Sequence, residues 1–87
     1  MKMIVRRDIS SSLMNKLRKQ ALRYVKANLK VGKVLSIEEV MIYIQGQILN
    51  IYPHIRKPML QRVSNVIIDR IAVPVRDMIA KYLRNKY

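Results

Sequence analysis

The chain of 87 residues has no cysteine, phenylalanine or tryptophan, and it contains two glycines and five acidic residues. Without cysteine there is neither a disulfide framework nor a thiolate metal site, so stability must come from hydrophobic packing, helped by oligomerisation. No apolar run approaches the roughly 20 residues needed to span a bilayer. We therefore expect one small domain, located in the cytoplasm or, if the source is viral, associated with the virion.

The groups that enzymes use are also scarce. His54 is the single histidine, so neither a histidine metal cluster nor a catalytic triad can be assembled. There is no glycine-rich phosphate loop, and the carboxylates do not form a spaced pair of acid and base. Glu38 and Glu39 are explained by helix capping and by the helix dipole. We expect a protein that is not an enzyme, without cofactor, metal or small-molecule substrate.

Positive charge is what the chain has in excess. Lysine and arginine total 18 against 5 aspartates and glutamates, which gives a net charge of +13. Such a charge destabilises a compact chain by self-repulsion unless a partner neutralises it. The partners that could do so are nucleic acids and anionic membrane surfaces. Double-stranded DNA is the partner we expect.

The positions of glycine and proline in the sequence predict an all-α fold. Gly32, Pro53, Pro58 and Pro74 divide the chain into helix-sized pieces. We expect a single DNA-binding domain over residues 1–87, a compact bundle of about four helices with a helix-turn-helix core, and one short strand at Met3 to Val5. The expected segments are a basic arm at 1–9 and helices at 10–31, 36–50, 57–72 and 74–86.

The first helix is predicted to have two unlike sides. Its apolar residues recur every four positions, and its cations recur at steps of three and four on the other side. The apolar stripe consists of Leu13, Leu17, Ala21, Val25 and Leu29, and the cationic stripe of Lys16, Lys19, Arg23, Lys26 and Lys30. We expect phosphate contacts from the basic arm, this stripe and the following turn, at Arg6, Arg7, Lys16, Lys19, Arg23 and Lys33.

The second helix is predicted to start with a capping box, in which Ser36 caps an amide and Glu39 reaches back. Beyond Glu39 the segment has no charge up to Ile55, and apolar residues cover most of its circumference. A helix of this kind is central to a core or buried in an oligomer. Because the second and last helices offer more apolar surface than a monomer of this length can cover, we expect a homodimer.

The segment from Leu35 to Ile71 resembles the N-terminal domain of the ferric uptake regulator family of winged-helix DNA-binding proteins. In that family a Ser-x-Glu-Glu-Val helix leads to Tyr-Pro-x-Ile and then to a recognition helix. The matching positions are Ser36, Glu38, Glu39, Val40, Tyr52, Pro53, Ile55, Arg62 and Asn65, with Gln61 in place of the usual tyrosine. A helix replaces the two-stranded wing, and the metal ligands of the family are missing. The resemblance therefore implies a trihelical DNA-reading unit without iron sensing.

In such a unit the recognition helix enters the major groove, and residues near its N-terminus meet base edges. Arginine pairs with guanine and an amide with adenine, each good pair adding roughly 1–3 kcal/mol of discrimination. The residues that the resemblance places at base edges are Arg56, Lys57, Gln61, Arg62 and Asn65. The alternative is that these side chains line a solvated helix face.

Other architectures and functions compete with this interpretation. The start of the chain, from Met3 to Leu17, resembles ribbon-helix-helix repressors, in which a strand carrying residues such as Lys2 and Arg6 pairs with its twin and enters the groove. The first helix is several residues too long for that fold. A protein that packages nucleic acid without sequence preference, an RNA-binding protein and a membrane-active cationic bundle are further alternatives.

Overall fold

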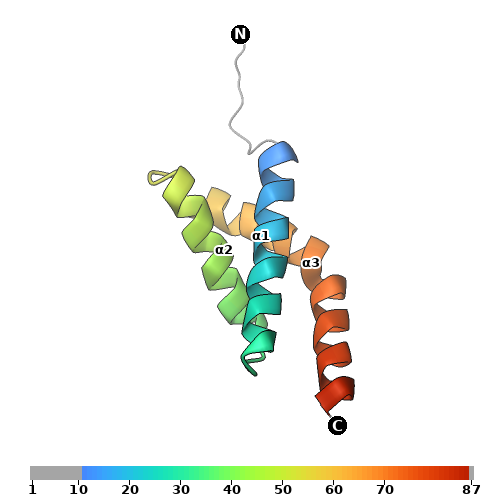
Figure 1. Ribbon diagram of the computed structural model, residues 1–87. Coiled ribbons are helices and arrows are strands. Elements are labelled where there is room, and N and C mark those ends of the chain that lie inside the picture. Colours follow the sequence, from blue (N-terminus) through green and yellow to red (C-terminus); the bar gives the residue numbers. More distant parts are fainter. Residues whose placement is uncertain (1–10, 87) are drawn as a thin grey trace.

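The structure, a computed structural model, describes residues 11–86. These residues form three helices, α1 (Ser11–Lys30), α2 (Ile37–Ile51) and α3 (Lys57–Lys86), and no strand (Figure 1). The predicted all-α class is confirmed. The expected strand at Met3 to Val5 and the basic arm with Arg6 and Arg7 lie outside the described residues.

The first helix ends where glycine allows the chain to turn. Gly32 has a positive φ of 83°, a conformation that costs glycine little because it has no Cβ. The amide of Gly32 donates to the carbonyl of Leu29 at 3.0 Å, and the amide of Lys33 donates to that of Asn28 at 2.8 Å. This pair of bonds is the Schellman arrangement, which satisfies carbonyls left open at a helix end. The predicted role of Gly32 is confirmed.

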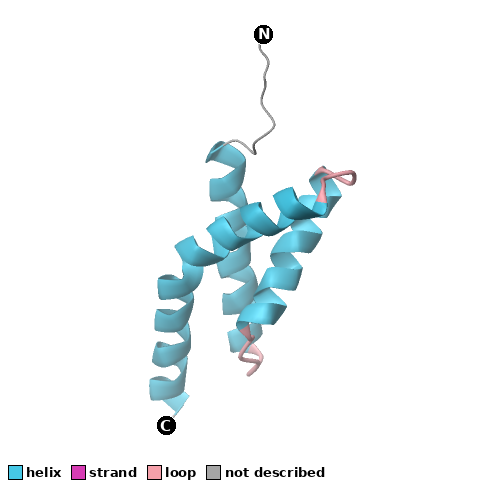
Figure 2. Ribbon diagram, turned by 180° about the vertical axis from the view of Figure 1, so that it is seen from behind, coloured by secondary structure: helices cyan, strands magenta, loops and turns pink. Residues whose placement is uncertain are grey.

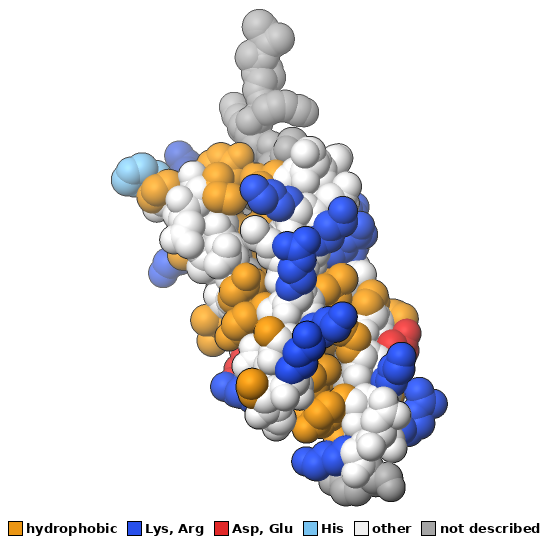
Figure 3. Space-filling view, in the orientation of Figure 1, with side chains coloured by type: hydrophobic (Ala, Val, Ile, Leu, Met, Phe, Trp, Pro, Cys, Tyr) orange, Lys and Arg blue, Asp and Glu red, His pale blue; other side chains and the backbone are white. Residues whose placement is uncertain are grey.

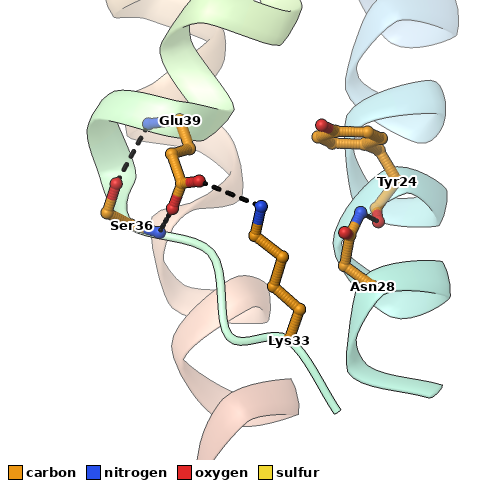
Figure 4. A network of polar contacts seen from close by, with 5 residues as sticks. All are labelled: Tyr24, Asn28, Lys33, Ser36 and Glu39. Carbon is orange, nitrogen blue, oxygen red and sulfur yellow. Dashed lines mark hydrogen bonds and ion pairs between the residues drawn. The ribbon is translucent and has the colours of Figure 1, made fainter. Parts of the chain in front are cut away.

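The second helix begins with the capping box that the sequence predicts (Figure 4). The Ser36 hydroxyl accepts from the amide of Glu39 at 3.1 Å, and the Glu39 carboxylate accepts from the amide of Ser36 at 3.0 Å. Both bonds satisfy donors that have no partner inside the helix. Helix α2 therefore starts at a position fixed by local chemistry.

The third helix corrects the prediction of four helices. Residues 57–72 and 74–86 belong to one helix with Pro74 inside it. Proline removes one hydrogen bond and its ring crowds the carbonyl four residues earlier, which kinks a helix without necessarily ending it. A helix bends away from the side that carries the proline ring, because the ring crowds the backbone there. Pro74 is on the exposed side of α3, so the bend turns the second half of α3 back toward the body of the protein (Figures 1 and 2).

The three helices pack in two layers. Helices α1 and α2 run side by side in opposite directions, and the first half of α3 crosses behind both of them (Figures 1 and 2). The second half of α3 returns along α1, where Met78, Ile79 and Tyr82 pack against the core. A Cβ placed on Gly32 would lie 3.8 Å from the Tyr82 hydroxyl oxygen, so this half reaches the end of α1.

The core draws on every helix. It consists of Leu17, Ala21, Val25, Leu29, Leu35, Val40, Ile44, Ile48, Val63, Ile67, Ile71 and Val75. The buried polar side chain Ser64 donates to the carbonyl of Leu60 at 2.6 Å, so it does not leave an unsatisfied group inside. Burial of this apolar surface is what fixes which side of each helix remains outside.

Candidate nucleic-acid interface

The outer side of α1 carries a continuous row of positive charge. Its residues are three or four positions apart, so they share one side of the helix. We call this row the α1 cationic face; its members, all exposed, are Lys16, Lys19, Arg23, Lys26 and Lys30. The first and last members are 14 residues apart, which is about 21 Å along the axis. Figure 3 shows lysine and arginine side chains running down α1 on this side of the molecule.

No carboxylate opposes this row. Helix α1 contains no aspartate or glutamate, and none of the five cations makes an ion pair with another described residue. A shallow, open depression of about 520 Å³ lies over the first half of the face, lined by Ser12, Asn15, Lys16, Lys19, Gln20 and Arg23. The lining combines cations with neutral donors, which are the groups that contact phosphate oxygens.

Lys33 is placed differently from the other predicted phosphate contacts. Its ammonium lies 3.4 Å from a carboxylate oxygen of Glu39 (Figure 4). The hydrogen bond from the backbone of Ser36, followed by that from Lys33, lowers the pKa of Glu39 below its ordinary value. Lys33 therefore ties the turn to α2, and its charge is already partly balanced.

The predicted base-reading residues gather at the start of α3. Arg56 precedes the helix and Lys57 opens it, and both are exposed. We call the next three, Gln61, Arg62 and Asn65, the α3 polar face; all are exposed on the side opposite the buried Val63 and Ile67. The structure thus brings these five predicted residues to one end of one helix.

The amides of the α3 polar face form a chain. Gln45 of α2 donates to the Gln61 side chain at 3.4 Å, and Gln61 donates to that of Asn65 at 3.0 Å. Arg62 donates to the sulfur of Met59 at 3.2 Å. Sequence analysis missed Gln45, because nothing in the sequence links positions 16 residues apart on different helices. These hydrogen bonds orient the side-chain amides of Gln61 and Asn65, and both side chains remain exposed to solvent.

One acidic residue interrupts this side of α3. Asp69 lies four residues after Asn65 and seven after Arg62, so it follows them on the same side, and it is exposed. A carboxylate at this point repels phosphate. The part of α3 suited to an anionic partner is therefore its first three turns.

The two predicted contact sets lie on different sides of the molecule. Helices α1 and α3 contact each other, and both contribute buried residues to the common core, among them Leu17 and Val25 from α1 and Ile67 and Ile71 from α3. The exposed side of each helix is opposite its buried side, so the two exposed sides point away from each other. In Figure 1 α1 lies in front of the first half of α3, and in the opposite view of Figure 2 α3 lies in front. The structure therefore places the predicted phosphate contacts of α1 and the predicted base contacts of α3 on separate surfaces.

Neither a metal-ligand cluster nor a membrane-spanning helix is found among the described residues. Within residues 11–86, no three histidine, aspartate or glutamate side chains gather as metal ligands do. His54 is an exposed residue of the turn before α3. None of the three helices has the length and apolar character needed to cross a membrane.

Comparison with known proteins yields no relative: no family model matches the chain, and neither a curated protein nor a solved structure matches it.

Proposed function

We propose that this protein binds duplex DNA and acts as a small transcriptional regulator. The observation that carries the proposal is the α1 cationic face, five exposed cations over about 21 Å on a helix without carboxylates. A row of this kind displaces condensed counterions from a phosphate polymer, which is the main source of sequence-independent affinity. Self-repulsion within the row falls when such a polymer binds.

The first half of α3 is the part that we propose reads sequence. It crosses the other two helices as the outermost element on its side (Figure 2). A single helix fits the major groove, which is about 12 Å wide. Arg62 and Asn65 have the chemistry that pairs with guanine and adenine, and both are exposed. The turn of residues 52–56 between α2 and α3 suits the helix-turn-helix interpretation.

Burial in α1 argues against the membrane-active alternative. An amphipathic helix binds lipid by placing its apolar side among acyl chains. In α1 that side is already occupied, since Leu17, Ala21, Val25 and Leu29 are buried in the core. The outer side offers cations with Ala27 as its apolar member. Lipid binding through α1 would require the bundle to open.

Packaging without sequence preference is the second candidate. It is favoured by the α1 cationic face, because lysine and arginine contacts to phosphates give affinity and carry no sequence information. Selection of bound sequences from a random duplex library separates the two functions. An enriched palindrome supports a dimeric regulator, and no enrichment supports packaging.

The direct test is duplex binding as a function of salt. Fluorescence anisotropy with a labelled duplex, between about 50 and 200 mM KCl, should give an affinity that falls steeply with salt. Replacing Lys19, Arg23 and Lys26 by glutamine should reduce the slope of log K against log salt by up to about 2.7, at 0.9 per phosphate contact. A matched triple replacement of Lys81, Arg84 and Lys86 removes the same charge elsewhere. Negligible duplex binding, or tighter binding to anionic liposomes at equal salt, would overturn the proposal.

A further inference from the structure

Two basic surfaces of this protein cannot be neutralised by the same straight duplex. The first is the α1 cationic face. The second is the start of α3, where Arg56, Lys57 and Arg62 precede the first carboxylate of that helix, Asp69. Neither surface has an acidic residue among its members.

The packing of α1 against α3 separates these surfaces. The helices contact each other through their buried sides, so their outer sides are about two helix diameters apart, roughly 20 Å. This distance exceeds the reach of lysine and arginine side chains. Helix α1 lies in front of the first half of α3 in Figure 1 and behind it in the opposite view of Figure 2, so the two helices lie on opposite faces of the molecule. A duplex on one surface leaves the cations of the other in solvent.

We propose that the protein bridges two duplex segments, one on the α1 cationic face and one on the start of α3; this inference rests on the proposed binding of duplex DNA. The duplex on the α1 cationic face is bound through its phosphates alone. The duplex at the start of α3 contacts Gln61, Arg62 and Asn65, which can bind base edges. A bridge of this kind joins a segment chosen by sequence to any nearby segment, and the second contact gains from the high effective concentration of linked DNA.

Capture of one duplex by another tests the bridge. A biotinylated duplex is fixed on beads, a fluorescent duplex of the same sequence is added, and the fluorescence retained by the full-length protein is measured. The α1 variant carries Lys19→Gln, Arg23→Gln and Lys26→Gln, and the α3 variant carries Arg56→Gln, Lys57→Gln and Arg62→Gln. The control with the same charge loss carries Lys81→Gln, Arg84→Gln and Lys86→Gln. Circular dichroism establishes that each variant is helical, and anisotropy measures its binding to one duplex.

All proteins in this test also carry Ile42→Glu, at the exposed surface of α2, so that pairing of two copies cannot supply a second DNA-binding surface. The protein with both basic surfaces intact and the control should retain the fluorescent duplex. The α1 and α3 variants should each bind a single duplex, yet lose retention to the level without protein. Single-duplex binding without retention by the protein with both basic surfaces intact would overturn the bridge and leave the proposed function standing. Absence of single-duplex binding would overturn both. Retention that survives in both the α1 and the α3 variant would also overturn the inference.

Discussion

The ring of Tyr24 in α1 stacks on the ring of Tyr43 in α2, with centroids 3.9 Å apart and planes inclined by 6°. Both residues are half-buried and join the two helices of the front layer. We expect Tyr43→Ala to lower the free energy of unfolding by about 1–3 kcal/mol, because it removes the stack and part of the apolar contact. Urea denaturation followed by circular dichroism measures the loss.

A double-mutant cycle with Tyr24→Ala isolates the stack from the rest of the contact. Aromatic pairs contribute about 0.5–1.5 kcal/mol beyond area burial, and we expect a coupling energy of that size. Strictly additive losses would show that the rings touch without stabilising each other.

The capping box makes stability depend on pH. The backbone hydrogen bond from Ser36 and the bond from Lys33 lower the pKa of Glu39 from its ordinary 4.5. Because the folded pKa is the lower one, the ionised carboxylate stabilises the fold fully above about pH 4.5 and loses this effect as the pH falls through the folded pKa. We expect the urea midpoint of the wild type to exceed that of Glu39→Gln at neutral pH, with a gap that closes in acid. A gap independent of pH would contradict this account.

The sequence predicted the elements better than their arrangement. Leu17, Ala21, Val25 and Leu29 were expected on one stripe and are all buried, because helical periodicity alone decides which residues share a side. The capping box and the Gly32 turn are likewise local, and both are confirmed. These features depend on residues at most five apart in the chain.

The errors concern features that depend on distant residues. Pro74 was expected to separate two helices, but Val75, Met78 and Tyr82 pack on the core and hold the helix together across the kink. Helix α2 was expected to be central to a core or buried in an oligomer, and the sequence did not show that Ile42 is 68 % exposed within one copy. The sequence also could not show that the α1 cationic face and the start of α3 point away from each other, since that depends on how the helices cross.

Two single substitutions separate affinity from specificity. Arg62→Ala should relax sequence preference, at a loss of roughly 1–3 kcal/mol on the preferred site, because it removes a base contact. Lys19→Ala should weaken binding to all sequences alike and lower the salt slope by about 0.9. Anisotropy titrations on selected and scrambled duplexes at several salt concentrations measure both. Equal behaviour of the two variants would favour packaging over regulation.

Asp69 offers an isosteric test of whether α3 meets DNA. Asp69→Asn removes a negative charge beside Arg62 and Asn65 with little change in shape. If phosphates approach this side of α3, the affinity for duplex should rise and its salt slope should steepen, because a repulsion is lost. The matched control is Asp77→Asn, which removes the same charge one half-helix away, beyond Pro74. Identical affinities for the two variants would exclude the first half of α3 from the interface.

The outer side of α2 is where we expect two copies of the protein to meet. Ile42 and Leu49 are exposed, 68 % and 40 % respectively, and Gly46 lies between them with nothing within 4 Å of a Cβ placed there. A small residue inside an apolar row lets a second helix approach closely. In an antiparallel pair, Glu38 and Glu39 at the start of one α2 would face the end of the other, near Arg56. Opposite charges would then fix the direction of the pair.

Ile42→Glu places a charge at the centre of this surface. We expect it to shift sedimentation at micromolar concentration from dimer toward monomer while leaving the helical signal intact, because residue 42 is outside the core. Val73→Glu is the matched control, since Val73 is similarly exposed, at 64 %, but lies on α3. A palindromic site should lose affinity with Ile42→Glu more than a single half-site does, because two linked recognition helices gain from effective concentration. A wild-type protein that sediments as a monomer would remove the basis for pairing through α2.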